Sequence, residues 1–158
     1  MPITTGDAAA TPARSLRQRW ISACARTDPD QLHILADVLG IDGTAFDVLR
    51  PAENGLVMVR GRAGGTGQLF NAGEMTVTRC SVRGRSGHVG HGYVAGRDKT
   101  HAELAARLDA HFQAQPDDTT LPIVAELEQQ IGERAHARQQ KSAPTRVEFF
   151  TMVRGEDE

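Results

Sequence analysis

The chain has 158 residues and a formal net charge of −2, with 39% hydrophobic but only 4% aromatic residues. This length fits one domain, and the near-neutral charge argues against a nucleic-acid-binding protein. No apolar run reaches the roughly 18 residues of a membrane span, and the first residues lack a signal-peptide pattern. We therefore expect a cytoplasmic protein whose aromatic-poor core is completed by a partner.

The chain has two cysteines, Cys24 and Cys80, which lie far apart in the sequence. No CxxC or CxxH spacing is present, so neither a zinc site nor a disulfide framework is predicted. One bridge between them stays possible, but two buried thiols in a reducing compartment are favoured.

Two helices are predicted after a disordered leader at residues 1–13, within a single domain that covers residues 14–158. Ser15 is a plausible N-cap for the first helix, whose apolar positions recur at helical spacing. Asp28 can cap the second helix, with Pro29 at its first position and Gln31 reaching back. Gly40 ends this helical hairpin.

A short strand and three further strand patterns follow, and the last three predict an antiparallel β-meander. Residues 45–50 form a short strand that we expect to end at Pro51. Residues 56–62, 68–83 and 88–96 are joined by glycine-rich turns, and Ala72-Gly73 indicates a β-bulge in the middle run.

The remaining chain predicts two helices and a last strand. Residues 98–115 are a helix with a capping-box signature at Thr100 and Glu103, and Pro122 opens the next helix. Residues 146–154 are apolar on both faces of a strand, which fits a central strand or an arm (143–158) docked into a partner. The fold class is therefore α+β.

The glycine-rich segment GRAGGTG at residues 61–67 invites a phosphate-binding interpretation, because glycines let backbone N–H groups converge on an anion. The segment lacks the Gly-Lys-Ser/Thr of a Walker loop, and Phe70 replaces the last glycine of the dinucleotide pattern. A turn that needs positive φ is favoured, with Gly64, Gly65 and Gly67 kept as ligand or interface candidates.

Positive charge is concentrated between Gly55 and Arg97, where six arginines face one glutamate, so 6 − 1 = +5. Arg79 and Arg83 share one face of a predicted strand, and Arg60 and Arg62 share one face of another. Guanidinium groups suit phosphates and carboxylates. An anion site, an interface with an acidic partner and a solvated face all stay open.

Histidines provide two further candidates. His88 and His91 are three residues apart, which places them on opposite faces of a strand, and no third ligand is near, so no metal site is predicted. His101 lies in the first turn of a helix beside Asp98. A contact to an anion and simple exposure at the helix start both remain open.

Three segments, GLVMVRGRAGGTGQLFNAGEMTVTRCSV, GHGYVAGRDKTHAE and TRVEFFTMVRGEDE, resemble the PhnG family, the G subunits of the bacterial carbon–phosphorus lyase complex. The resemblance runs from about Arg19 to the C-terminus and is poor at residues 113–142. It implies H, I and J partner subunits in a two-fold symmetric assembly, together with an L protein. It also implies MgATP as a substrate of the complex, with no cofactor bound by this chain.

The resemblance implies a role in phosphonate catabolism, in which the ribose triphosphate moiety of MgATP is transferred to an alkylphosphonate and adenine is released. We expect a subunit without a complete active site, inactive alone, with Arg79, Arg97 and His101 as anion or interface contacts. The alternative is a phosphonate- or nucleotide-binding, or assembly, module for the I-type subunit. No catalytic residue is assigned.

Overall fold

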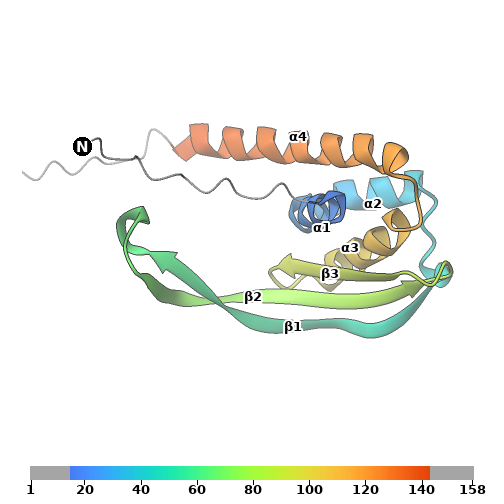
Figure 1. Cartoon of the computed structure of the whole chain (residues 1–158), viewed down its shortest axis with the longest axis horizontal. Coiled ribbons are helices and arrows are strands. Elements are labelled where there is room, and N and C mark those ends of the chain that lie inside the picture. The colour runs from blue at the N-terminus through green and yellow to red at the C-terminus, as the bar shows by residue number, and fades with distance from the viewer. Residues whose placement is uncertain (1–14, 143–158) are drawn as a thin grey trace, which may run out of the picture.

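A computed structural model describes residues 15–142 of the chain. The predicted leader at residues 1–13 and the predicted strand or arm at 143–158 lie outside the described residues. The described chain is α+β, as predicted: two helices, a three-stranded antiparallel sheet and two further helices. Figure 1 shows the four helices on one side of the sheet, and no described element covers its other face, which we call the uncovered face.

The N-terminal pair α1 (Leu16–Arg26) and α2 (Pro29–Val38) begins at local signals that the sequence carries. Ser15 Oγ accepts from the Gln18 N–H, and the Gln18 side chain accepts from the Ser15 N–H, which closes a capping box. Asp28 caps α2 and Pro29 opens it, as predicted. The contact predicted from Gln31 is wrong, because this side chain lines a groove between α2 and α4 (Asp117–Ser142) instead.

The first strand, β1 (Phe46–Arg62), follows a short turn, η1 (Gly43–Ala45), and does not end at Pro51, so that prediction is wrong. Among residues 15–142 the strand order is β1-β2-β3, which makes β1 an edge strand with one side unpaired by any described strand. Proline is tolerated there because its missing N–H need not break the ladder. Register shifts between Val48 and Arg50 and between Arg50 and Glu53 accommodate it.

Strands β2 (Leu69–Gly84) and β3 (Val89–Ala95) complete the predicted meander, and a tight turn, η2 (Ala63–Gly65), joins β1 to β2. Val59 pairs with Gly73 and Arg60 pairs with Asn71, so one residue of β2, Ala72, has no partner opposite it. This is the predicted bulge.

Helix α3 (Lys99–Phe112) lies directly on the sheet because β3 has two glycines beneath it. A Cβ at Gly92 would lie 1.9 Å from Ala102 O, and one at Gly90 would lie 2.0 Å from Ala106 O. Only residues without side chains permit this approach.

The N-terminus of α3 is capped by Asp98, whose Oδ1 accepts from the His101 N–H at 2.9 Å. The predicted capping box that starts at Thr100 is wrong, because Thr100 already lies inside the helix. Asp98 stands three residues before His101, which is the spacing that an N-cap needs to reach the third helical N–H.

Helix α4 (Asp117–Ser142) begins before Pro122, so the predicted start is wrong. The N–H groups of Thr119 and Thr120 donate to Pro116 O, which starts the helix ahead of the proline. Pro122 then lies in the second turn, where it removes one backbone hydrogen bond.

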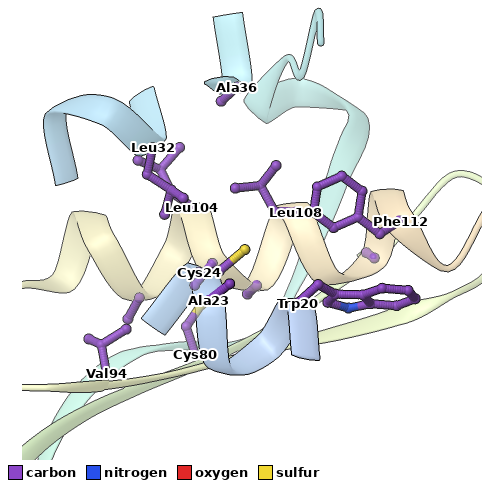
Figure 2. Packing of buried hydrophobic residues seen from close by; sticks show 14 of the residues in the cluster. Trp20, Ala23, Cys24, Leu32, Ala36, Cys80, Val94, Leu104, Leu108 and Phe112 are labelled. Atoms are coloured by element: carbon purple, nitrogen blue, oxygen red, sulfur yellow. The ribbon is translucent and has the colours of Figure 1, made fainter. Parts of the chain in front are cut away.

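The core lies between α1, α2 and α3 and between α3 and the sheet. Figure 2 shows the Trp20 indole beside the Phe112 ring, and the two ring centroids are 5.7 Å apart. Leu32 and Leu108 are fully buried between the helices. No helix of the described chain is both long and apolar enough to cross a membrane.

Candidate functional site

The sheet face opposite α3 carries charged or polar side chains from each of the three strands, among them Glu53, Arg79 and His91. On β2 the side chains of Thr78, Cys80 and Val82 are buried toward the helices, while Arg79 and Arg83 lie on the uncovered face. Arg79 and Arg83 therefore share one face, as the alternation predicted.

Arg79 stands between charged and aromatic neighbours on this face. It pairs with Glu53 on β1 and with Tyr93 on β3. Its Nε lies 2.8 Å from Glu53 Oε1, and the Arg50 Nη1 lies 3.6 Å from the same oxygen. The Glu53 carboxylate thus pairs with two guanidinium groups, each about half exposed. The three side chains together carry a net charge of about +1, which suits the binding of an anion.

The other predicted arginines are distributed over the molecule rather than gathered. Arg83 lies on the uncovered sheet face, Arg60 lies on the opposite face of β1 beyond α3, and Arg97 lies in the loop that precedes α3. All three are exposed, and within residues 15–142 none of them forms a hydrogen bond or ion pair. They are accessible to a partner or ligand but do not converge on one point.

His101 lies on the covered side of the sheet, away from Arg79. Only 7% of it is exposed, and its Nε2 lies 2.8 Å from Cys24 O, so it ties α3 to α1. The alternative of an exposed histidine at the helix start is therefore wrong. The Asp98 carboxylate already occupies the N-terminus of α3, where an external anion would bind.

The backbone conformation of the turn between β1 and β2 explains why the turn contains glycines. Gly64 and Gly65 have φ of 61° and 81°, which disfavours other residues. The Gly67 N–H donates to Ala63 O at 2.9 Å, and a Cβ at Gly67 would lie 2.5 Å from that oxygen. Arg62 Nη1 donates to Gly67 O at 3.1 Å and closes the loop. A ligand contact at these glycines stays a prediction.

The two strand histidines each bond to a neighbouring hydroxyl. His91 Nδ1 lies 2.9 Å from Ser81 Oγ, and His88 Nδ1 lies 3.0 Å from Ser86 Oγ. Among the residues that the structure describes, no group of three or more potential metal ligands is present.

Asp109 is the buried polar residue that sequence reasoning missed. It is 1% exposed and accepts hydrogen bonds from Trp20 Nε1 at 2.9 Å and from the His91 N–H at 2.9 Å. Arg17 Nη2 lies 3.0 Å from its Oδ2, and this hydrogen bond raises the pKa of the guanidinium. The signal in the sequence is an aspartate on the apolar face of α3, beside Leu108 and Phe112. It joins α1, α3 and β3.

Both cysteines are free and buried, as predicted. Burial raises the pKa of the Cys24 thiol to about 12 and also raises the pKa of Cys80. A thiol with such a pKa is a poor nucleophile at neutral pH. Cys24 and Cys80 therefore act as core residues.

Comparison with known proteins identifies relatives along nearly the whole chain. Residues 15–155 match the family model described as "Phosphonate metabolism protein PhnG". The chain is 42% identical, over 145 residues, to the "Alpha-D-ribose 1-methylphosphonate 5-triphosphate synthase subunit PhnG" of Rhizobium meliloti (strain 1021). This alignment covers 89% of the chain and 90% of that relative. The chain belongs to the PhnG family.

Proposed function

We propose that the chain is a subunit of an alpha-D-ribose 1-methylphosphonate 5-triphosphate synthase. In this role it supports transfer of the ribose triphosphate moiety of MgATP to an alkylphosphonate, with release of adenine. The observation that carries the proposal is the 42% identity to a protein of that name across about nine-tenths of both chains.

The partners that we propose are the H-, I- and J-type subunits of a two-fold symmetric complex, together with an L-type protein, in the cytoplasm. Two free cysteines suit a reducing compartment. Large apolar side chains stay exposed on the β1–β2 hairpin, among them Leu56, Met58 and Phe70. Such exposure is typical of a surface that is covered in an assembly.

The reaction sets the demands on this subunit. A phosphonate oxygen displaces adenine at the ribose anomeric carbon, so two highly charged groups must be held together while positive charge develops on the sugar. We propose that partner subunits supply the acid–base chemistry. The uncovered sheet face, with Arg79 and Arg83, would contribute fixed positive charge at a shared boundary.

Co-expression with the other subunits tests the assembly. We expect the chain to elute with the I-type subunit on size-exclusion chromatography, and to show no ATP hydrolysis or adenine release when purified alone. Turnover by the isolated chain, or elution apart from all of the partners, would contradict the proposal.

The second candidate is a binding module that delivers a phosphonate or nucleotide to the I-type subunit. The accessible guanidinium groups of Arg83 and Arg97 favour it. Titration calorimetry of the isolated chain with MgATP and with methylphosphonate distinguishes the two candidates. Absence of heat with both ligands would remove the binding module and leave the subunit role intact.

A further inference from the structure

One part of the sheet reaches beyond the rest of the described molecule. We call residues 55–76 the arm: the end of β1, the glycine turn and the start of β2. The pairing of β2 with β3 ends at Val77 and Ala95, and one further bond runs from the Gly96 N–H to Thr76 O. Figure 1 shows the arm running past the tip of β3 to the turn on the left.

The arm has apolar side chains on both of its faces. Leu56 and Met58 alternate onto one face and are 64% and 51% exposed. Phe70, Met75 and Val59 are also exposed, and the register places them on the other face. A surface that rests flat on a partner needs apolar groups on one face only, so the two-sided pattern indicates insertion into a groove.

The backbone of the arm gives the same indication. From Leu69 to Met75, the edge of β2 on the β3 side has no ladder partner among the described residues. An isolated two-stranded hairpin is at best marginally stable in water. The arm is nevertheless well formed, with paired strands, a bulge at Ala72 and a closed turn. A partner that covers both faces would supply the missing burial.

Charge specifies the chemistry of that partner. Between Gly55 and Thr76 the ionised residues are Arg60, Arg62 and Glu74, so the arm carries 2 − 1 = +1. Both arginines stand next to the turn. An apolar groove bordered by carboxylates therefore fits this end of the arm.

We propose that the arm inserts into an apolar groove of another subunit, a groove whose rim carries aspartate or glutamate side chains. This inference rests on the proposed function as a subunit. It deepens that function by naming the segment that makes the contact and the chemistry of the surface that receives it.

Co-purification of the tagged complex tests the proposal, with the wild-type chain as the reference. In the double variant Leu56→Glu/Met58→Glu we expect the affinity for the receiving subunit to fall more than tenfold. The matched control is Val38→Glu on α2, which is 77% exposed, lines the groove between α2 and α4, and lies outside the arm. The control should bind as the wild type does.

A charge reversal keeps the test valid if the double variant does not fold. Arg60→Glu changes an exposed side chain without a described partner, and we expect it to weaken binding and to reduce the salt dependence of the affinity. Unchanged affinity in both the Arg60 and the double variants would overturn the proposal. Loss of binding in the Val38 control alone would place the contact on α2 and α4 instead.

Two other occupants of the arm would also overturn the proposal. A wild-type chain that is a dimer on its own, and that Leu56→Glu dissociates, would indicate a second copy of the chain. A chain that unfolds more easily after removal of residues 143–158, and to the same extent as the double variant, would indicate its own C-terminal segment. A wild-type chain that binds no subunit would refute the proposed function itself.

Discussion

The contact between β3 and α3 gives a prediction whose size follows from the geometry. In the variant Gly92→Ala the new Cβ would meet Ala102 O at 1.9 Å, whereas ordinary contact begins near 3.4 Å. The obstructing atoms belong to backbone, which cannot rotate away. Helix α3 must therefore retreat by about 1.5 Å, which loosens its packing on Val82 and Val94 beneath it.

Overpacking a core usually costs about 1–3 kcal/mol. Because backbone opposes backbone at Gly92, we expect the upper end of this range, a loss of about 3 kcal/mol in the free energy of unfolding. The matched control is Gly55→Ala in β1, where no atom lies within 4 Å of the new Cβ. It should raise stability by about 0.5 kcal/mol, because alanine restricts the unfolded chain more than glycine does.

Urea unfolding followed by Trp20 fluorescence measures both variants, since Trp20 is the only tryptophan and is buried in the core. A Gly92→Ala midpoint equal to or above that of the wild type would refute the close approach of α3 to β3. A loss in Gly55→Ala as large as in Gly92→Ala would refute the steric explanation.

Three further predictions concern named side chains. Asp109→Ala removes the acceptor of the Trp20 Nε1–H and of the His91 N–H and the ion-pair partner of Arg17, and should cost about 3 kcal/mol. Asp109→Asn, which keeps one acceptor oxygen, should cost less in the same urea assay, and equal losses would contradict this. The pKa of Cys24 is raised from 9.0 to about 12, so between these pH values the folded chain retains a proton that the unfolded chain releases. The contribution of Cys24 to the free energy of unfolding is therefore constant below about pH 9 and falls as the pH rises from 9 toward 12. Unfolding curves between pH 8 and 10.5 should show this fall, and a Cys24→Ala variant with the same slope would disprove its origin. Arg79→Ala removes a half-exposed ion pair with Glu53 and should change stability by less than about 1 kcal/mol; a reduced rate of adenine release by the assembled complex would then assign Arg79 to the shared boundary, and an unchanged rate would exclude it.

The local signals of the sequence predicted most of the fold. Ser15 and Asp28 begin their helices because a cap needs only neighbouring backbone N–H groups. The bulge at Ala72 was predictable because Ala72-Gly73 interrupts one run of strand-forming residues. These features depend on residues within a few positions of one another.

Features set by distant contacts were not predictable. Pro51 continues a strand because β1 lies at the edge of the described sheet, whereas the local preference of the residue before a proline predicts an end there. Gly92 resembles any strand glycine until α3 lies on it. His101 resembles an exposed helix-start residue, yet it is buried, because α3 packs against α1 and its Nε2 lies 2.8 Å from the carbonyl oxygen of Cys24, 77 positions away.

The candidate site was predictable only in part. Alternation placed Arg79 and Arg83 on one face of β2, but the shared carboxylate of Glu53 depends on the register of β1 against β2. The arm is exposed because β3 ends at Ala95, close to the predicted end at residue 96, whereas the pairing of β1 with β2 continues beyond it.

Adenine release by the reconstituted complex tests the central claim most directly. The partner subunits and the L-type protein would be incubated with MgATP and methylphosphonate, with and without this chain, and free adenine would be measured by chromatography. We predict release only when the chain is present together with its partners, and none from the chain alone. Full release without the chain would contradict its role as a subunit of the synthase.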